Sequence, residues 1–195
     1  MQIDRILYPV TTLGPGQRVA IWTVGCSKHC FHCANPELWD PDPAREQPAE
    51  EIASLILERL KDCRPDGITV TGGDPMEQPE ELLTLLRALR PLTEDILVYT
   101  GYTLEELEHT LPVSLMDGFR ETVGVLIDGR YVEELNDGKS PLTGSTNQTL
   151  HYFRPQLRET YAAYMAGGRK IQNFYSGGRL ISVGIHNPHP SGPKS

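Results

Sequence analysis

The segment Gly67-Ile-Thr-Val-Thr-Gly-Gly-Asp-Pro75 contains the pattern from which the architecture of the chain follows. Its first five residues have the β-branched, largely apolar character of a short strand buried on both faces. The glycine pair ends the strand, and residues 77–90 then place leucines on one face of a helix. A buried strand that leads through a tight turn into an amphipathic helix is one βα unit of a parallel sheet.

The same unit repeats along the chain. Further β-type runs lie at residues 18–23, 95–100 and 123–128. A helical face is expected over residues 48–62, and Thr103 with Glu106 has the spacing of a capping box at the start of a third helix. This alternation predicts an α/β fold with a right-handed parallel sheet, either open or curved into part of a barrel.

Length and composition exclude several classes of protein. The chain has 195 residues, with 18 Lys and Arg against 26 Asp and Glu, and 38% of its residues are hydrophobic. This is enough for one domain with a real core. The net charge of −8, without clusters of basic residues, argues against binding to nucleic acid. No run approaches the roughly 20 apolar residues of a membrane span, and the first residues lack the pattern of a signal peptide, so a soluble, cytoplasmic protein is expected.

Unusual residues follow each predicted strand. The first strand leads into a cysteine-rich loop, the second into Gly72-Gly-Asp-Pro75, the third into Thr100-Gly-Tyr102 and the fourth into Asp128-Gly-Arg130. Because the carboxyl ends of parallel strands meet at one edge of a sheet, these loops are expected to form one ligand site.

The cysteine loop is Cys26-Ser-Lys-His-Cys30-Phe-His-Cys33. Three thiolates on a short loop can hold three corners of a cubic iron–sulfur cluster and leave the fourth iron open to another ligand. Two alternatives remain at this point: zinc held by the cysteines together with His29 or His32, or a chance cluster of thiols. Cys63 stands apart and is interpreted as structural or incidental.

The cysteine spacing after the first strand, followed by Gly-Gly-acid-Pro after the second, resembles the radical S-adenosylmethionine (SAM) superfamily. In that superfamily the open iron of a [4Fe-4S] cluster is chelated by the methionine part of SAM, and one electron from the cluster cleaves the sulfonium to a 5′-deoxyadenosyl radical. The resemblance implies an incomplete parallel β/α barrel for the fold.

Further segments narrow the resemblance to the activating proteins of glycyl radical enzymes, over roughly residues 6–152. The matching pieces are Gly14-Pro-Gly-Gln-Arg18, Cys33-Ala-Asn-Pro-Glu-Leu-Trp-Asp40, Tyr99-Thr-Gly-Tyr102, Leu126-Ile-Asp-Gly-Arg-Tyr131 and Gly144-Ser-Thr-Asn-Gln148. The implied partners are a glycyl radical enzyme, anaerobic ribonucleotide reductase above all, and flavodoxin or ferredoxin as the electron donor. Neither a nucleic acid nor a membrane is expected as a partner.

The resemblance also implies roles for individual residues. The implied cluster ligands are Cys26, Cys30 and Cys33, and the implied cofactor-binding residues are Gly72, Gly73, Asp74, Thr100, Asp128, Arg130 and Asn35. Asp74 stands where most superfamily members carry Glu, and Arg130 stands where Lys is frequent. His32 occupies the position before the third cysteine that is usually aromatic. No general base is assigned, because hydrogen abstraction by a radical does not need one.

The chain continues beyond this resemblance. We expect a core over residues 1–152, a helix and a β-hairpin over residues 153–186 that pack on the core, and a flexible tail over residues 187–195. The extension is expected to cover an open end of the incomplete sheet, with substrate recognition as the alternative.

Two other functions are kept beside the activating enzyme. One is a radical SAM enzyme that takes hydrogen from a small molecule or a peptide. The other, from a different class, is a zinc-binding module without catalysis.

Overall fold

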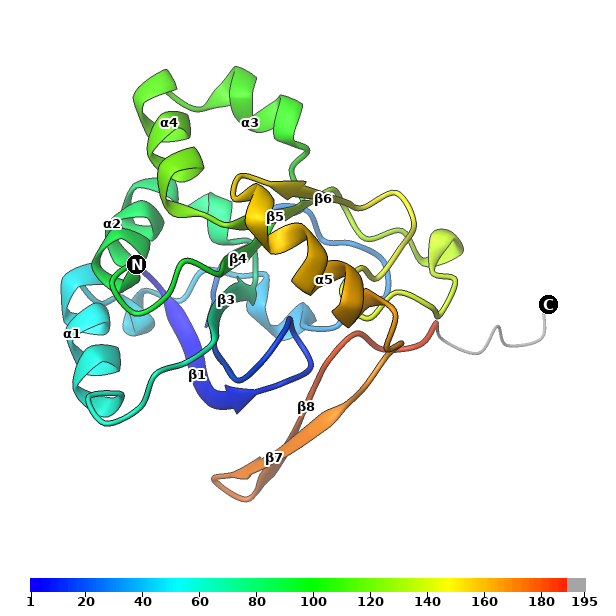
Figure 1. The fold of residues 1–195 in the computed structure, drawn as a ribbon, viewed down its shortest axis with the longest axis horizontal. Coiled ribbons are helices and arrows are strands. Elements are labelled where there is room, and N and C mark those ends of the chain that lie inside the picture. The colour runs from blue at the N-terminus through cyan, green and yellow to red at the C-terminus, as the bar shows by residue number, and fades with distance from the viewer. Residues whose placement is uncertain (189–195) are drawn as a thin grey trace.

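The computed structural model describes residues 1–188, which form a mixed α/β fold around a six-stranded sheet with the strand order β1-β2-β3-β4-β5-β6 (Figure 1). The strands of this sheet are β1 (Ile3–Val10), β2 (Arg18–Thr23), β3 (Gly67–Gly72), β4 (Ile96–Tyr99), β5 (Val125–Asp128) and β6 (Thr149–Tyr152). A separate hairpin consists of β7 (Gln172–Ser176) and β8 (Arg179–Val183).

The four central strands, β2 to β5, run parallel, which confirms the predicted parallel sheet. In the register, Val19 lies opposite Ile68, and Val70 lies opposite Val98. These apolar side chains are fully buried because the central strands are covered on both faces. The carboxyl ends of all four strands therefore meet at one edge of the sheet.

The two outer strands, β1 and β6, were not predicted, and both pair antiparallel with their neighbours. β1 contains Asp4, Arg5 and Pro9, which interrupt the apolar pattern by which a strand is recognised in a sequence. Proline cannot donate a ladder hydrogen bond, so it is tolerated at an edge. β6 has only four residues and offers too short a pattern for prediction.

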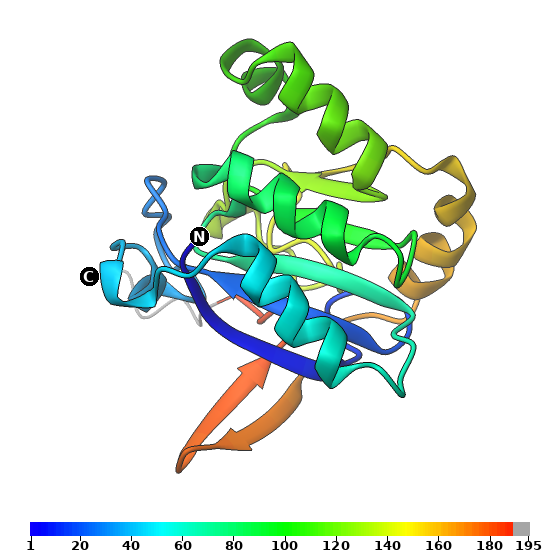
Figure 2. The same ribbon diagram turned by 90° about the vertical axis from the view of Figure 1, so that its left-hand side faces the viewer.

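One face of the sheet is covered by helices, which lie in front of it in Figure 2. The α-helices of the described residues are α1 (Ala49–Arg59), α2 (Pro79–Leu89), α3 (Leu104–Thr110), α4 (Val113–Thr122) and α5 (Arg158–Met165). The predicted helices α1 and α2 are present, and α3 begins with the predicted capping box of Thr103 and Glu106. Helix α4 was missed because Gly118 interrupts its pattern. A side chain there would approach Leu83 Cδ2 to 2.5 Å, so glycine allows α4 to pack on α2.

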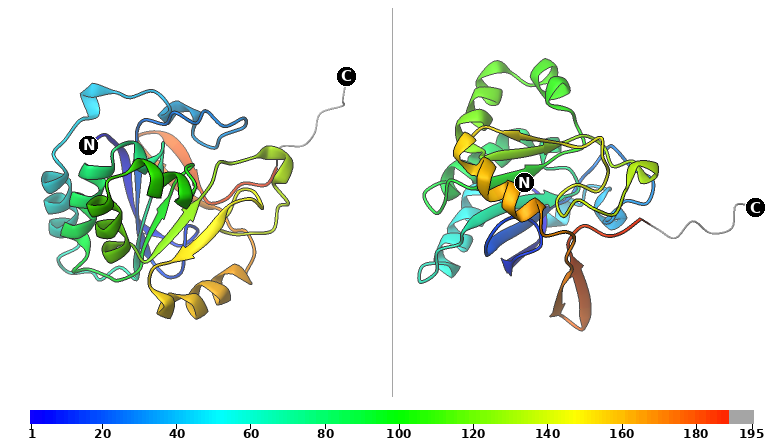
Figure 3. Two further views of the ribbon diagram at one scale, coloured as in Figure 1. Left: turned by 90° about the horizontal axis from the view of Figure 1, so that it is seen from above. Right: turned by 45° about the vertical axis from the view of Figure 1, so that its right-hand side comes forward.

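The chain after β6 packs on the other face of the sheet through α5 and through part of the hairpin β7–β8. Helix α5 lies on the side of the sheet away from α1 and α2 (Figure 3). Its Tyr161 packs in an apolar cluster with residues of β4 and β5, and Val183 of β8 packs in a cluster with residues of β1 and β2. The predicted C-terminal helix and hairpin are thus present. The expected tail lies, from residue 189 onward, outside the described residues.

Arg18 is a charged residue at the centre of the fold, with no exposed surface. Its guanidinium binds Asp95 through two nitrogens, at 2.7 and 3.0 Å, and donates to Thr69 Oγ1 at 2.7 Å. The Tyr161 hydroxyl donates to Asp95 at 2.7 Å. This network ties α5 to the start of β2 and β4.

None of the helices built by residues 1–188 is long and apolar enough to cross a bilayer.

Candidate functional site

The loops at the carboxyl ends of β2, β3 and β4 surround a cavity of about 820 Å³. Its wall includes most of the residues expected to form a site: Cys26, Cys30, Cys33, Asn35, Gly73, Asp74 and Thr100. Sequence segments separated by up to about 70 residues therefore meet where the parallel topology requires them to meet.

The cysteine loop has an unusual backbone. All three cysteines are unpaired and partly buried. Among the described residues, His29 and His32 are the non-glycine positions with positive φ, at 46° and 56°. Each of them directly precedes a cysteine, Cys30 or Cys33. Non-glycine residues in the left-handed region are uncommon and concentrate at functional sites, so the loop has the backbone character of a ligand-binding segment.

Backbone N–H groups act on the cysteine thiols. Asn35 N donates to Cys33 Sγ at 3.4 Å, and the backbone N–H groups of Lys28 and His29 lower the pKa of Cys26, while that of Tyr131 lowers the pKa of Cys30. Burial raises the pKa of the Cys26 and Cys30 thiols, and these N–H groups oppose the rise. N–H donors stabilise the negative charge of a thiolate, and hydrogen bonds to sulfur are a feature of iron–sulfur sites.

Zinc would need three or more donors around a single point. The His, Cys, Asp and Glu side chains of residues 1–188 form no such group. A cubic cluster has a different requirement, because each cysteine binds a different iron atom.

The Gly-Gly-Asp turn is bonded directly to the strand that carries the cysteine loop. Gly73 N donates to Thr23 O at 2.8 Å, and Asp74 N donates to Gly25 O at 2.7 Å. A Cβ on Gly73 would lie 2.4 Å from the same Gly25 oxygen. Gly72 has a φ of +117° and does not itself line the cavity. Glycine is required here because the two backbones touch.

Asp74 is 1% exposed, and its carboxylate accepts three hydrogen bonds. Its Oδ1 accepts from Thr100 Oγ1 at 2.9 Å and from Met76 N at 3.0 Å, and its Oδ2 accepts from Gly101 N at 2.8 Å. Burial raises the pKa of Asp74, and these hydrogen bonds act in the opposite direction. Asp74 and Thr100 thus fix the relative position of two neighbouring loops.

Besides Gly72, two of the expected cofactor residues, Asp128 and Arg130, lie away from the cavity wall. Asp128 is buried, and its Oδ2 accepts from Leu104 N at 2.7 Å and lies 2.9 Å from His151 Nε2. It therefore faces the start of α3. Arg130 is exposed. Asn35 does line the cavity, and its side-chain oxygen accepts from Arg5 at 2.9 Å.

The cavity also contains residues that were not singled out from the sequence, among them Lys28, Tyr99, Tyr131 and Arg169. The Tyr99 hydroxyl has no hydrogen-bond partner among the described residues. Burial raises the pKa of Tyr99 far above its ordinary value. Strand alternation could have identified Tyr99, because it shares the face of Leu97 rather than that of Val98.

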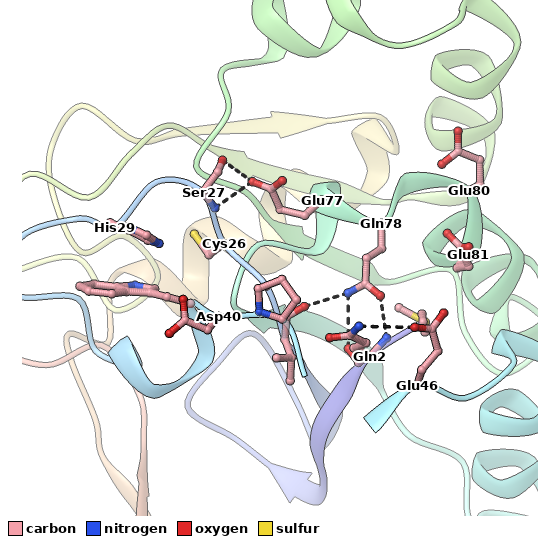
Figure 4. A pocket seen from close by; sticks show the side chains of 15 residues that line it. Gln2, Cys26, Ser27, His29, Asp40, Glu46, Glu77, Gln78, Glu80 and Glu81 are labelled. Atoms are coloured by element: carbon pink, nitrogen blue, oxygen red, sulfur yellow. Dashed lines mark hydrogen bonds between the residues drawn. The ribbon is translucent and has the colours of Figure 1, made fainter. Parts of the chain in front are cut away.

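A second cavity, of about 600 Å³, lies on another side of Cys26 (Figure 4). Its wall carries the carboxylates of Asp40, Glu46, Glu77, Glu80 and Glu81. Ser27 N donates to Glu77 at 3.0 Å, so the cysteine loop is also anchored to the segment before α2. The many carboxylates make this cavity unsuitable for an anionic ligand.

Comparison with known proteins agrees with this geometry. Residues 12–151 match the family described as a 4Fe-4S single cluster domain, so the chain is of the iron–sulfur class. It belongs, within that class, to the family of anaerobic ribonucleoside-triphosphate reductase-activating proteins. The protein of that name from Vibrio cholerae serotype O1 is 34% identical over 154 residues, which cover 75% of this chain and 95% of the relative. Those from Escherichia coli K12 and Enterobacteria phage T4 are 33% and 32% identical and are covered to 96% and 93%.

Proposed function

We propose that the chain is a radical SAM activating enzyme. It binds a [4Fe-4S] cluster through Cys26, Cys30 and Cys33, cleaves SAM reductively and generates a glycyl radical on anaerobic ribonucleotide reductase. The observation that carries this proposal is that the three cysteines of one short loop share one cavity with Gly73 and Asp74 of the Gly-Gly-Asp turn. The names of the relatives support the reductase as the partner.

The residues present fit these groups. Cys63 follows α1, is exposed and does not line the cavity, so the cysteine loop provides three ligands and leaves one iron for SAM. Gly73 and Gly101 keep the wall free of side chains, and a Cβ on Gly101 would lie 2.9 Å from Lys28 Cγ.

We assign the following tasks to the protein. The cysteine loop holds the cluster, and Gly72, Gly73 and Asp74 hold the methionine end of SAM, while Thr100 orients Asp74. When bound, the cluster would supply the one-electron reduction of SAM, with flavodoxin or ferredoxin as the electron donor, and thereby the hydrogen abstraction from a glycine of the partner. The chain itself binds, orients and excludes water.

Three finer points belong to the same proposal. We interpret the open sheet as a partial barrel of the radical SAM type, with residues 1–152 as its core and residues 153–186 as an extension. We place the protein in the cytoplasm, where thiols stay reduced. A cofactor contact for Asn35, Asp128 and Arg130 stays a prediction; for Asp128 the bond to Leu104 N supports a role in positioning α3.

The test is anaerobic reconstitution with iron and sulfide, followed by incubation with SAM, a reductant and the reductase. We expect a brown protein with a [4Fe-4S] spectrum, formation of 5′-deoxyadenosine and a glycyl radical EPR signal on the reductase. A colourless protein that binds zinc would overturn the proposal in favour of a binding module. Formation of 5′-deoxyadenosine with no radical on a competent reductase would point to another substrate, a small molecule or a peptide.

A further inference from the structure

The end of the described chain forms part of the cavity that contains the cysteines. Arg169, Ile171, Gly184, Ile185 and His186 all line this cavity. They lie beyond residues 12–151, the segment that matches the family. The wall they form is therefore a feature of this chain outside the shared core.

This extension is attached at both ends of the curved sheet. On one side, Tyr161 of α5 packs in a cluster with residues of β4 and β5. On the other side, Val183 is buried against β1 and β2, and its carbonyl accepts from Thr12 Oγ1 at 2.9 Å. Gln172 adds hydrogen bonds of 2.9 Å to Thr11 N and to Pro9 O. The segment that lines the cavity is thus anchored at its base.

Arg169 ties the segment to the opposite wall. Its guanidinium donates to the carbonyls of Ser140, Thr143 and Gly144 at 2.9, 3.2 and 3.4 Å, and to the carbonyl of His186 at 2.5 Å. Among the described residues it forms no ion pair with a carboxylate. A planar guanidinium can bridge carbonyls from two separate segments, which a lysine ammonium does less well. Arg169 therefore joins the loop at 140–144 to the strand exit at residue 186.

Gly184 marks a second close contact in this wall. Its φ is +141°, and a Cβ there would lie 2.3 Å from Lys170 O. The two chain segments at the base of the hairpin thus touch through their backbones. A side chain at position 184 would therefore force the backbone at Gly184 apart from that at Lys170.

We propose that residues 169–188 form a fixed wall of the cavity and that Arg169 is the positioning residue that holds this wall in place. The wall bounds one side of the cavity that contains the cysteines. It also keeps water from the cysteine end of the cavity. This inference rests on the proposed function for the identity of the occupant, but the wall itself can be tested without it.

The first test measures access to the thiols in the metal-free full-length chain. A bulky maleimide is applied, and the rates at Cys30 and Cys33 are divided by the rate at the exposed Cys63 in the same molecule. We expect Arg169→Ala to raise this ratio about fivefold or more, because the wall opens. Arg169→Lys should give an intermediate ratio. The matched control is Arg179→Ala, at an exposed position on the hairpin, which should leave the ratio unchanged.

A second pair of variants covers the case in which Arg169→Ala does not fold, as judged by circular dichroism. Gly184→Ala should raise the ratio in the same way. Gly178→Ala should not, because Gly178 also has positive φ, 75°, but has nothing within 4 Å of a Cβ. If either variant, Arg169→Ala or Gly184→Ala, is folded and has the same ratio of maleimide rates as the wild type, the proposal of a fixed wall is wrong.

The third measurement uses the cluster-loaded protein with the reductase. We expect Arg169→Ala to form about threefold more 5′-deoxyadenosine per glycyl radical than the wild type, with a similar dissociation constant for SAM, because shielding rather than binding is lost. If the wild type cleaves no SAM, the proposed function is wrong. The ratios of maleimide rates then test by themselves whether residues 169–188 form a fixed wall. Suppose that the Arg169→Ala variant forms as much 5′-deoxyadenosine per glycyl radical as the wild type and also has the wild-type ratio of maleimide rates. This result would show that Arg169 does not position the wall.

Discussion

The hydroxyl of Thr100 donates a hydrogen bond of 2.9 Å to Oδ1 of Asp74, a carboxylate that is buried beneath the cavity. Thr100 follows β4 and Asp74 follows β3, so this bond joins the loops of two neighbouring strands. Gly101 N donates to the other oxygen of Asp74 at 2.8 Å. The Gly-Gly-Asp turn is therefore held in place from the side as well as from the strand that bears the cysteines.

Replacing Thr100 with valine removes this bond, and the bond that Thr100 Oγ1 accepts from Tyr102 N at 3.1 Å, with little change in side-chain shape. We expect the free energy of unfolding to fall by about 1–3 kcal/mol, because Asp74 Oδ1 loses a buried donor and Tyr102 N loses its acceptor. SAM should also bind more weakly. Urea unfolding and equilibrium binding measure these effects. Thr110→Val, at an exposed position in α3, is the control and should stay within about 0.5 kcal/mol of the wild type. A Thr100→Val variant as stable as the control would show that these bonds contribute nothing.

Gly73→Ala tests the contact between the two motifs. The new Cβ would lie 2.4 Å from Gly25 O, next to the first cysteine, so the turn and the cysteine loop must move apart. We expect a loss of about 1–3 kcal/mol in unfolding free energy, as for other overpacked sites, and reduced iron incorporation. Gly167→Ala is the control, since its Cβ would find its nearest atom at 3.2 Å. Normal iron content in the Gly73→Ala variant would contradict a coupling between the motifs.

The centre of the fold could be predicted because its residues carry strong local patterns. β3 and the two helices α1 and α2 have apolar runs and helical periodicity, which survive in any context. The outer strand β1 could not be recognised, because edge strands need no continuous apolar run. Helix α4 packs closely on α2 because Gly118 has no side chain. This contact is between distant parts of the chain, so no local sequence pattern predicts it.

Site residues could be predicted from the sequence where the backbone topology alone brings them to the cavity. They could not be predicted where the direction of the side chain determines whether a residue lines the cavity. The cysteines and Asp74 line the cavity because strand ends converge. Asp128 does not, since alternation along β5 gives it the face of Leu126, which packs with the helices, and its carboxylate meets Leu104 N. The role of Arg169 could not be predicted from the sequence for another reason. The acceptors of its hydrogen bonds are backbone carbonyls, which every residue has.

Cys30→Ser and Cys63→Ser form a matched pair for the ligand assignment. Cys30 lines the cavity, whereas Cys63 is exposed and outside it. After anaerobic reconstitution we expect Cys30→Ser to lose most of the bound iron and sulfide, because a serine hydroxyl is a poor ligand for iron–sulfur clusters. Cys63→Ser should retain wild-type iron content and spectrum. Full iron content in the Cys30 variant, or a loss in the Cys63 variant, would contradict the three-cysteine assignment.

Tyr161→Phe tests the network that attaches α5 to the core, and it has a characteristic dependence on pH. Burial raises the pKa of Tyr161 well above its ordinary value of 10, and Asp95 adds to the rise. Above about pH 10 the unfolded chain loses this proton while the folded chain keeps it. The wild type should therefore lose stability as the pH rises, and this one group contributes up to about 1.4 kcal/mol per pH unit.

At pH 7 the Tyr161→Phe variant should be less stable by about 1–3 kcal/mol, because Asp95 loses a buried donor. Between about pH 10 and 11 the difference should shrink, since phenylalanine has no proton to lose. Tyr99 and Tyr164 also have raised pKa values, so some alkaline loss should remain in both proteins. Urea unfolding at several pH values measures the curves, with exposed Tyr175→Phe as the control. Parallel curves for Tyr161→Phe and the wild type would mean that Tyr161 is not held neutral by the fold.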